Sequence, residues 1–98
     1  MNMQSIMAQA QRMQRDLQKK KDEINVKEFI GTQDFVEVTL NGKKEMLRCK
    51  INKDSLDSAD IEMLEDLIVL AVKSAISQID KEYKDKMGQY AGMLDGLM

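Results

Sequence analysis

The first part of the chain follows a helical pattern of apolar positions. These positions recur at steps of three and four residues, the heptad spacing of a helix that buries a single seam. The pattern predicts a helix over about residues 2–24, with no Gly or Pro to interrupt it. Its seam consists of Met3, Ile6, Ala10, Met13, Leu17 and Ile24, with Lys20 at the position where the repeat lacks an apolar residue.

The period changes after Val26, where short segments rich in β-branched and aromatic residues predict a sheet over about residues 26–51. Asn41-Gly42 is the dipeptide preferred in a two-residue type I′ turn, which would pair Leu40 with Lys43 and Val36 with Leu47. One sheet face then carries Val36, Val38, Leu40, Leu47, Cys49 and Ile51. The opposite face carries Phe35, Glu37 and Thr39 against Lys44, Met46, Arg48 and Lys50.

A second long helix is expected over about residues 58–87. Ser58 or Asp60 is a candidate N-cap, and Gly88 is a candidate stop that would leave a flexible tail over residues 88–98. The middle of this helix, DLIVLAVKSAISQI, is apolar on more than one side. One helix and one small sheet cannot cover it, so we expect a homodimer whose core or interface includes Leu67, Ile68, Leu70, Val72, Phe35 and Met46.

Composition narrows the class of protein. The 98 residues, 43% hydrophobic and 33% charged, fit a single small globular domain. The single cysteine excludes an intrachain disulfide, and together with the absence of His it excludes a Cys/His zinc site. The N-terminus lacks the apolar core of a signal peptide, and no apolar run is long enough for a membrane span. We expect a soluble protein of the reducing cytosol that does not bind membranes.

The charge is unevenly distributed along the chain. Residues 1–53 contain 11 Lys/Arg and 7 Asp/Glu, a net +4, whereas residues 54–98 contain 4 and 10, a net −6. The segment QAQRMQRDLQKKK, residues 9–21, holds five basic residues and one acid. Arg12, Arg15 and Lys19 share the helix face opposite the seam, which suits a polyanion partner, although the residues alone favour a solvated face because rows of charge on helices are usually solvated.

The sequence offers little chemistry for catalysis or cofactor binding. There is no His for acid–base catalysis, and neither the GxGxxG nor the GxxxxGK[ST] phosphate-binding motif occurs. The acids near the start of the second helix lack the spacing of a calcium loop and have ready roles as turn and cap groups. We expect no enzyme activity, no cofactor, no metal and no small-molecule substrate.

The chain resembles the YbaB/EbfC family of bacterial nucleoid-associated proteins over nearly its whole length. The resemblance rests on MNMQSIMAQAQRMQRDLQKKKDEI, on the Asn-Gly hairpin, and on DIEMLEDLIVLAVKSAI followed by KMGQYAGML. The family's first-helix motif falls on Gln9, Ala10, Gln11, Met13 and Gln14, and its second-helix motif falls on residues 62–68. Two features depart from the family pattern: GTQDF has a single glycine, and the tail lacks a proline.

The resemblance implies an α+β fold, with an α-β-β-β-α protomer of two long helices and a small three-stranded antiparallel sheet. It further implies a cytoplasmic homodimer that binds duplex DNA, helps to organise the nucleoid and influences gene expression. With it, phosphate contact becomes the preferred interpretation of Arg12, Arg15, Lys19, Lys20 and Lys21, and Lys44, Arg48 and Lys50 form a second candidate surface.

The main alternative is a small acidic dimeric chaperone or adaptor. The chain has nine methionines, several of them on the helix seams, and a flexible methionine-rich surface can hold a protein partner. Such binding would survive salt and depend on Met13, Phe35 or Met46. An enzyme acting through Glu62 and Asp66 is a distant third.

Overall fold

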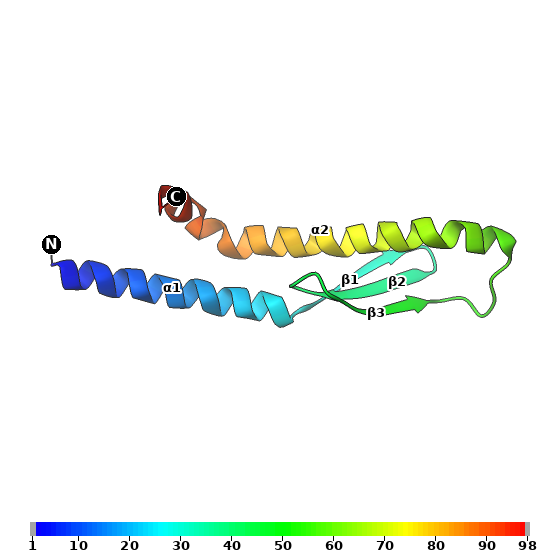
Figure 1. Cartoon of the computed structure of the whole chain (residues 1–98), viewed down its shortest axis with the longest axis horizontal. Helices are drawn as coiled ribbons and strands as arrows, with labels where there is room; N and C mark the ends of the chain where they lie inside the picture. Colours follow the sequence, from blue (N-terminus) through cyan, green and yellow to red (C-terminus); the bar gives the residue numbers. More distant parts are fainter. Residues whose placement is uncertain (1, 98) are drawn as a thin grey trace.

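The computed structural model describes the backbone of residues 2–97 and the side chains of residues 2–88. Helix α1 (Met3–Val26) is followed by strands β1 (Glu28–Gln33), β2 (Val36–Asn41) and β3 (Met46–Ile51), and then by helix α2 (Ser58–Leu97). The predicted α+β class and the α-β-β-β-α order are confirmed. The molecule is elongated, 71 × 20 × 15 Å, with the sheet towards one end and α1 towards the other (Figure 1).

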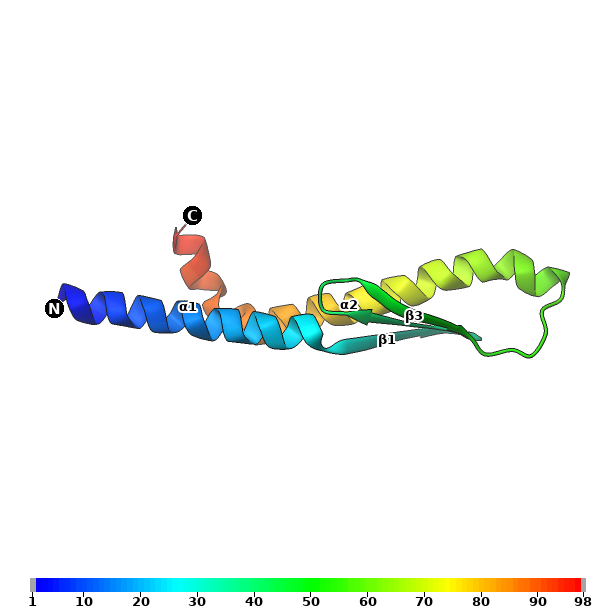
Figure 2. The same cartoon turned by 60° about the horizontal axis from the view of Figure 1, so that its bottom comes forward.

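Helix α1 begins at a polar cap and ends against the sheet. The Asn2 side chain accepts a hydrogen bond from the Gln4 backbone N–H at 3.1 Å, which satisfies one of the donors left unpaired at a helix start. Of its predicted seam, only Ile24 is buried, whereas Met13 and Leu17 are half-buried and Met3 is exposed. The N-terminal half of α1 extends past the sheet in both views (Figures 1 and 2).

The three strands form an antiparallel sheet in the order β1-β2-β3. The predicted hairpin register between β2 and β3 is wrong, because Val36 opposes Ile51 and Leu40 opposes Met46. The Asn41 side chain accepts hydrogen bonds from the backbone of Lys43 and Glu45, and Lys44 adopts a positive φ of 67°. The chain therefore makes a longer turn than the two-residue type I′ loop. Next to this turn the pairing of β2 with β3 shifts by one residue between Thr39 and Leu40, as in a β-bulge.

The predicted sharing of sheet faces largely survives this change of register. Val36 moves from Leu47 to Ile51, a shift of four residues, and an even shift keeps side chains on the same face. Val38 pairs with Cys49 as a consequence. Met46 differs, because it opposes Leu40 instead of belonging to the other face.

Helix α2 covers one face of β1 and β2. The core consists of Ile24, Phe29, Phe35, Val36, Val38, Leu40, Leu67, Ala71, Ala75 and Ile79. Gly31 allows the close approach, since a Cβ there would collide with the Ala71 carbonyl. Gly42 likewise lies against the Ile24 carbonyl of α1. Both glycines are thus required for packing, and for Gly42 this role adds to the turn that the sequence predicts.

Strand β3 lies outside this cover, and all six of its residues are exposed. Cys49 is exposed in the single chain, although it shares a sheet face with the buried Val38, as the sequence predicts. The reason is that α2 packs over β1 and β2 and does not reach the third strand.

The two ends of α2 differ from the sequence prediction. Asp57, not Ser58 or Asp60, is the cap: its Oδ1 accepts from the Asp60 N–H at 2.8 Å, and Asp60 Oδ2 accepts from the Asp57 N–H at 3.2 Å. The helix also continues through Gly88 to Leu97, because each of the three glycines in this segment costs a helix only about 1 kcal/mol relative to alanine. The predicted flexibility of residues 88–98 stays a prediction, because the side chains of residues 89–98 lie outside the described residues.

Candidate nucleic-acid interface

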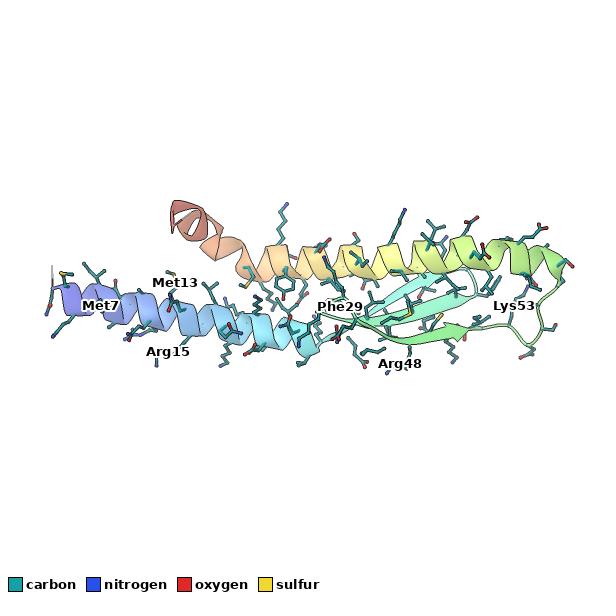
Figure 3. The ribbon with its side chains drawn as sticks, viewed as in Figure 1. Met7, Met13, Arg15, Phe29, Arg48 and Lys53 are labelled. Carbon is teal, nitrogen blue, oxygen red and sulfur yellow. The ribbon has the colours of Figure 1, made fainter. Side chains whose placement is uncertain are left out.

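The outward face of α1 carries the best-presented positive charge. Arg15 lies opposite the seam, and Arg12 and Lys19 lie within about 60° of it around the helix. All three side chains are exposed, and Arg15 projects from the side of α1 away from α2, whereas Met13 lies on the side towards α2 (Figure 3). The structure therefore brings these three predicted residues together on one surface, which we call the outer face of α1.

These charges are not neutralised within the part of the chain whose side chains the structure describes. Among residues 2–88, Arg12, Arg15, Lys19 and Lys21 form no ion pair with an acidic side chain. A cation without an internal partner keeps its full charge for an external anion.

Lys20 and Lys21 do not share the outer face with the other three. Lys20 occupies the seam and is half-buried. Lys21 lies about 120° around the helix from Arg15 and lines a shallow hollow together with Gln14, Leu17, Gln18 and Met87 of α2. The five basic residues of this segment thus form one outward group of three and one group of two near the second helix.

The second candidate surface is largely paired. The Lys44 ammonium lies 3.0 Å from the Asp80 carboxylate of α2, and the Arg48 guanidinium lies 2.9 Å from the Glu28 carboxylate of β1. Lys50 is exposed and opposes Glu37 across the sheet. Because each cation has an acidic neighbour, this surface offers a phosphate less net positive charge than the outer face of α1.

The predicted core and interface residues fall into two groups. Leu67 and Phe35 are buried in the single chain, and Ile68 and Val72 pack half-buried against the core. Leu70 and Met46 are about half exposed, at 45% and 48%. Leu47, Ile51 and Val69 are further apolar residues that are exposed in the single chain.

Other kinds of site find no support in the described part of the chain. No group of three or more His, Cys, Asp or Glu side chains there is arranged to hold a metal ion. None of its helices is long and apolar enough to cross a membrane. The Lys53 ammonium donates a hydrogen bond of 2.7 Å to the Asp60 carboxylate at the start of α2. This bond lowers the pKa of Asp60 and raises the pKa of Lys53.

Comparison with known proteins decides the family. Residues 1–94 match the model of the YbaB/EbfC DNA-binding family. The chain belongs to this family. A nucleoid-associated protein of Ligilactobacillus salivarius (strain UCC118) is 39% identical over 99 residues, which cover 99% of this chain and 95% of the relative. One from Streptococcus pneumoniae (strain Hungary19A-6) is 40% identical over 96 residues, covering 96% and 97%.

Membership in the YbaB/EbfC family confirms the resemblance seen in the sequence. The match includes the whole sheet and all of α1, so the outer face of α1 lies inside the range of residues that the family model matches. The family is a DNA-binding one and not an enzyme family.

The sequence interpretation assigned no role to one set of residues in this YbaB/EbfC domain. Gln4, Gln11 and Gln18 recur every seven residues on the outer face of α1, beside Arg15. The seven-residue spacing of these glutamines is visible in the sequence, but a neutral amide does not contribute to a pattern of charge.

Proposed function

We propose that this protein binds duplex DNA as a homodimer, mainly by contacting the phosphate backbone through the outer face of α1. The observation that carries the proposal is the exposed group of Arg12, Arg15 and Lys19, which has no internal ion pair within residues 2–88. The names of the family and of the two relatives support DNA as the partner.

The physical basis of this binding is counterion release. Each phosphate that a lysine or arginine neutralises frees condensed cations, so affinity falls steeply with salt and depends little on sequence. Lys20 and Lys21 would add contacts beside the outer face. The acidic second half of the chain, with its net −6, would keep DNA away from α2.

Dimerisation would cover the apolar surface beside β3. Gln78 of α2 donates to the Ile30 carbonyl of β1 at 2.7 Å, which places that flank of α2 over β1. Ile68 and Val72 lie about 80–120° further around the helix, on the flank towards β3. The single chain also leaves Leu47 and Ile51 of β3 exposed, and a second copy of the chain would bury both groups.

In the cell, such a dimer would act on the nucleoid in the cytoplasm. Two copies would present two outer faces to DNA, and this arrangement suits non-specific binding along the chromosome. Effects on nucleoid organisation and on gene expression would follow from that binding.

The test is a fluorescence-anisotropy titration of mixed-sequence duplex DNA at several salt concentrations. We expect an Arg12→Glu/Arg15→Glu/Lys19→Glu variant to lose binding, because three positive charges per chain become negative at the interface. A matched control reverses three exposed lysines of α2, Lys73→Glu/Lys81→Glu/Lys84→Glu. Equal loss in both variants would reject the outer face as the DNA contact, and absence of wild-type binding at low salt would reject DNA as the partner.

One observation favours the alternative of a chaperone or adaptor. Met3, Ile6 and Met7 at the start of α1 are exposed and apolar. Binding of a protein partner there would survive salt and would be lost on substitution of these residues. Phe35 is buried in the single chain, so it is not available to a partner as the sequence interpretation supposed.

A further inference from the structure

The outer face of α1 contains more than positive charge. Gln4, Gln11 and Gln18 lie within about 60° of Arg15 around the helix, opposite the apolar seam. The intervening Ala8 is small, and the first acidic residue on this face is Asp22. From Gln4 to Lys19, a face about 22 Å long therefore consists of amides, cations and alanine.

These amides are available for an external partner. Gln4, Gln11 and Arg15 are exposed, and their side chains form no hydrogen bond with another described residue. Gln18 donates one N–H to Asp22 Oδ1 at 2.8 Å, which orients its amide and leaves its oxygen and second N–H unused. Gln11, Arg15 and Gln18 border the same shallow hollow on the helix surface.

The chemistry of glutamine differs from what phosphate contact alone requires. A phosphate oxygen needs only a donor, preferably charged, so neutral amides add little to a purely electrostatic surface. A glutamine amide presents a donor and an acceptor side by side and can pair with both N6 and N7 of adenine in the major groove. Arginine pairs in the same bidentate way with O6 and N7 of guanine.

We propose that the outer face of α1 enters the major groove of duplex DNA, where Gln4, Gln11 and Gln18 contact adenine edges and Arg15 contacts a guanine edge. The inference rests on the proposed function and gives it a sequence preference. A helix is about as wide as the major groove, so α1 fits without widening it. Arg12 and Lys19, at the sides of this face, bind the flanking phosphates.

The experiment removes the acceptor that this pairing needs and leaves the phosphates unchanged. A duplex selected by the wild-type protein from a random pool is compared, at one fixed salt concentration, with the same duplex containing 7-deazaadenine and 7-deazaguanine. These bases retain Watson–Crick pairing but lack N7. We expect the modified duplex to bind about 10-fold more weakly for each bidentate pairing that the missing N7 prevents.

A matched pair of variants locates the effect on the helix. Gln11→Ala should reduce the discrimination between the two duplexes and leave the salt dependence unchanged. Gln9→Ala changes the same residue type at an exposed position about 120° from Arg15, and it should retain wild-type discrimination.

The possible failures are distinguishable. Equal wild-type affinity for the two duplexes, or equal effects of Gln9→Ala and Gln11→Ala, would overturn base contact and leave phosphate binding standing. Absence of wild-type binding to any duplex at low salt would overturn both proposals.

Discussion

The Lys44 ammonium lies 3.0 Å from the Asp80 carboxylate, joining the turn between β2 and β3 to the middle of α2. The two residues are 36 positions apart in the sequence, and no local pattern predicts that they meet. Both side chains are about half exposed, so the pair adds little to stability. Its consequence is electrostatic, because Lys44 already has an anionic partner before any DNA approaches.

The two candidate basic surfaces should therefore contribute unequally. We expect Arg12→Ala/Arg15→Ala/Lys19→Ala to lower the log–log salt slope of DNA binding by about 0.9 for each phosphate that is no longer neutralised. Lys44→Ala/Arg48→Ala/Lys50→Ala should lower it by less, since Asp80, Glu28 and Glu37 offset those charges. A larger change from the sheet variant would reverse our assignment of the main DNA-binding surface.

The oligomeric state depends on the apolar surface beside β3. Light scattering after size exclusion should give twice the chain mass of 11.2 kDa for the wild type. Leu47→Glu/Ile51→Glu should give the single-chain mass, because burying two carboxylates without partners is costly. Thr32→Glu/Gln33→Glu, at exposed positions of β1, is the control and should stay dimeric. A monomeric wild type at micromolar concentration contradicts the dimer.

Acid should weaken the start of α2 through Asp60. The hydrogen bond from Lys53 lowers the pKa of Asp60 from its ordinary value of 3.8, so its stabilising contribution is present above pH 3.8 and is lost as the pH falls further. Urea unfolding of the wild type and of Asp60→Asn should therefore differ at neutral pH and converge below that value. Asp54→Asn, at an exposed position, is the control and should have nearly the wild-type free energy of unfolding at neutral pH.

The same ion pair also responds to alkali. Its hydrogen bond raises the pKa of Lys53 above the ordinary value of 10.5, so the contribution is complete below pH 10.5 and is lost as the pH rises beyond it. A free energy of unfolding for Asp60→Asn that keeps a constant offset from wild type at both extremes would show that the ion pair contributes nothing.

Two glycines should respond oppositely to alanine. Gly31→Ala should destabilise the fold by about 1–3 kcal/mol, because the added methyl collides with the Ala71 carbonyl. Gly88→Ala should stabilise it by up to about 1 kcal/mol, since Gly88 is helical and no atom of the described residues lies within 4 Å of its Cβ position. Thermal or urea denaturation measures both, and destabilisation by Gly88→Ala would contradict a continuous α2.

Local sequence patterns predicted the elements of this protein well and their junctions poorly. The heptad spacing located α1, and alternation located the strands, since both periods are properties of the backbone itself. The hairpin register failed because the Asn41 side chain and the packing of Gly42 against α1 selected a different turn. The stop at Gly88 failed because helix propensity is a weak local preference.

The sequence by itself determined the order of elements, the family, and the concentration of positive charge between residues 9 and 21. Only the tertiary structure decided which charges remain available. It paired Lys44 with Asp80 and Arg48 with Glu28, and among residues 2–88 it left Arg12, Arg15 and Lys19 without an ion pair. The physical reason is that charge is a property of each residue, whereas neutralisation depends on which distant segments packing brings within a few ångströms.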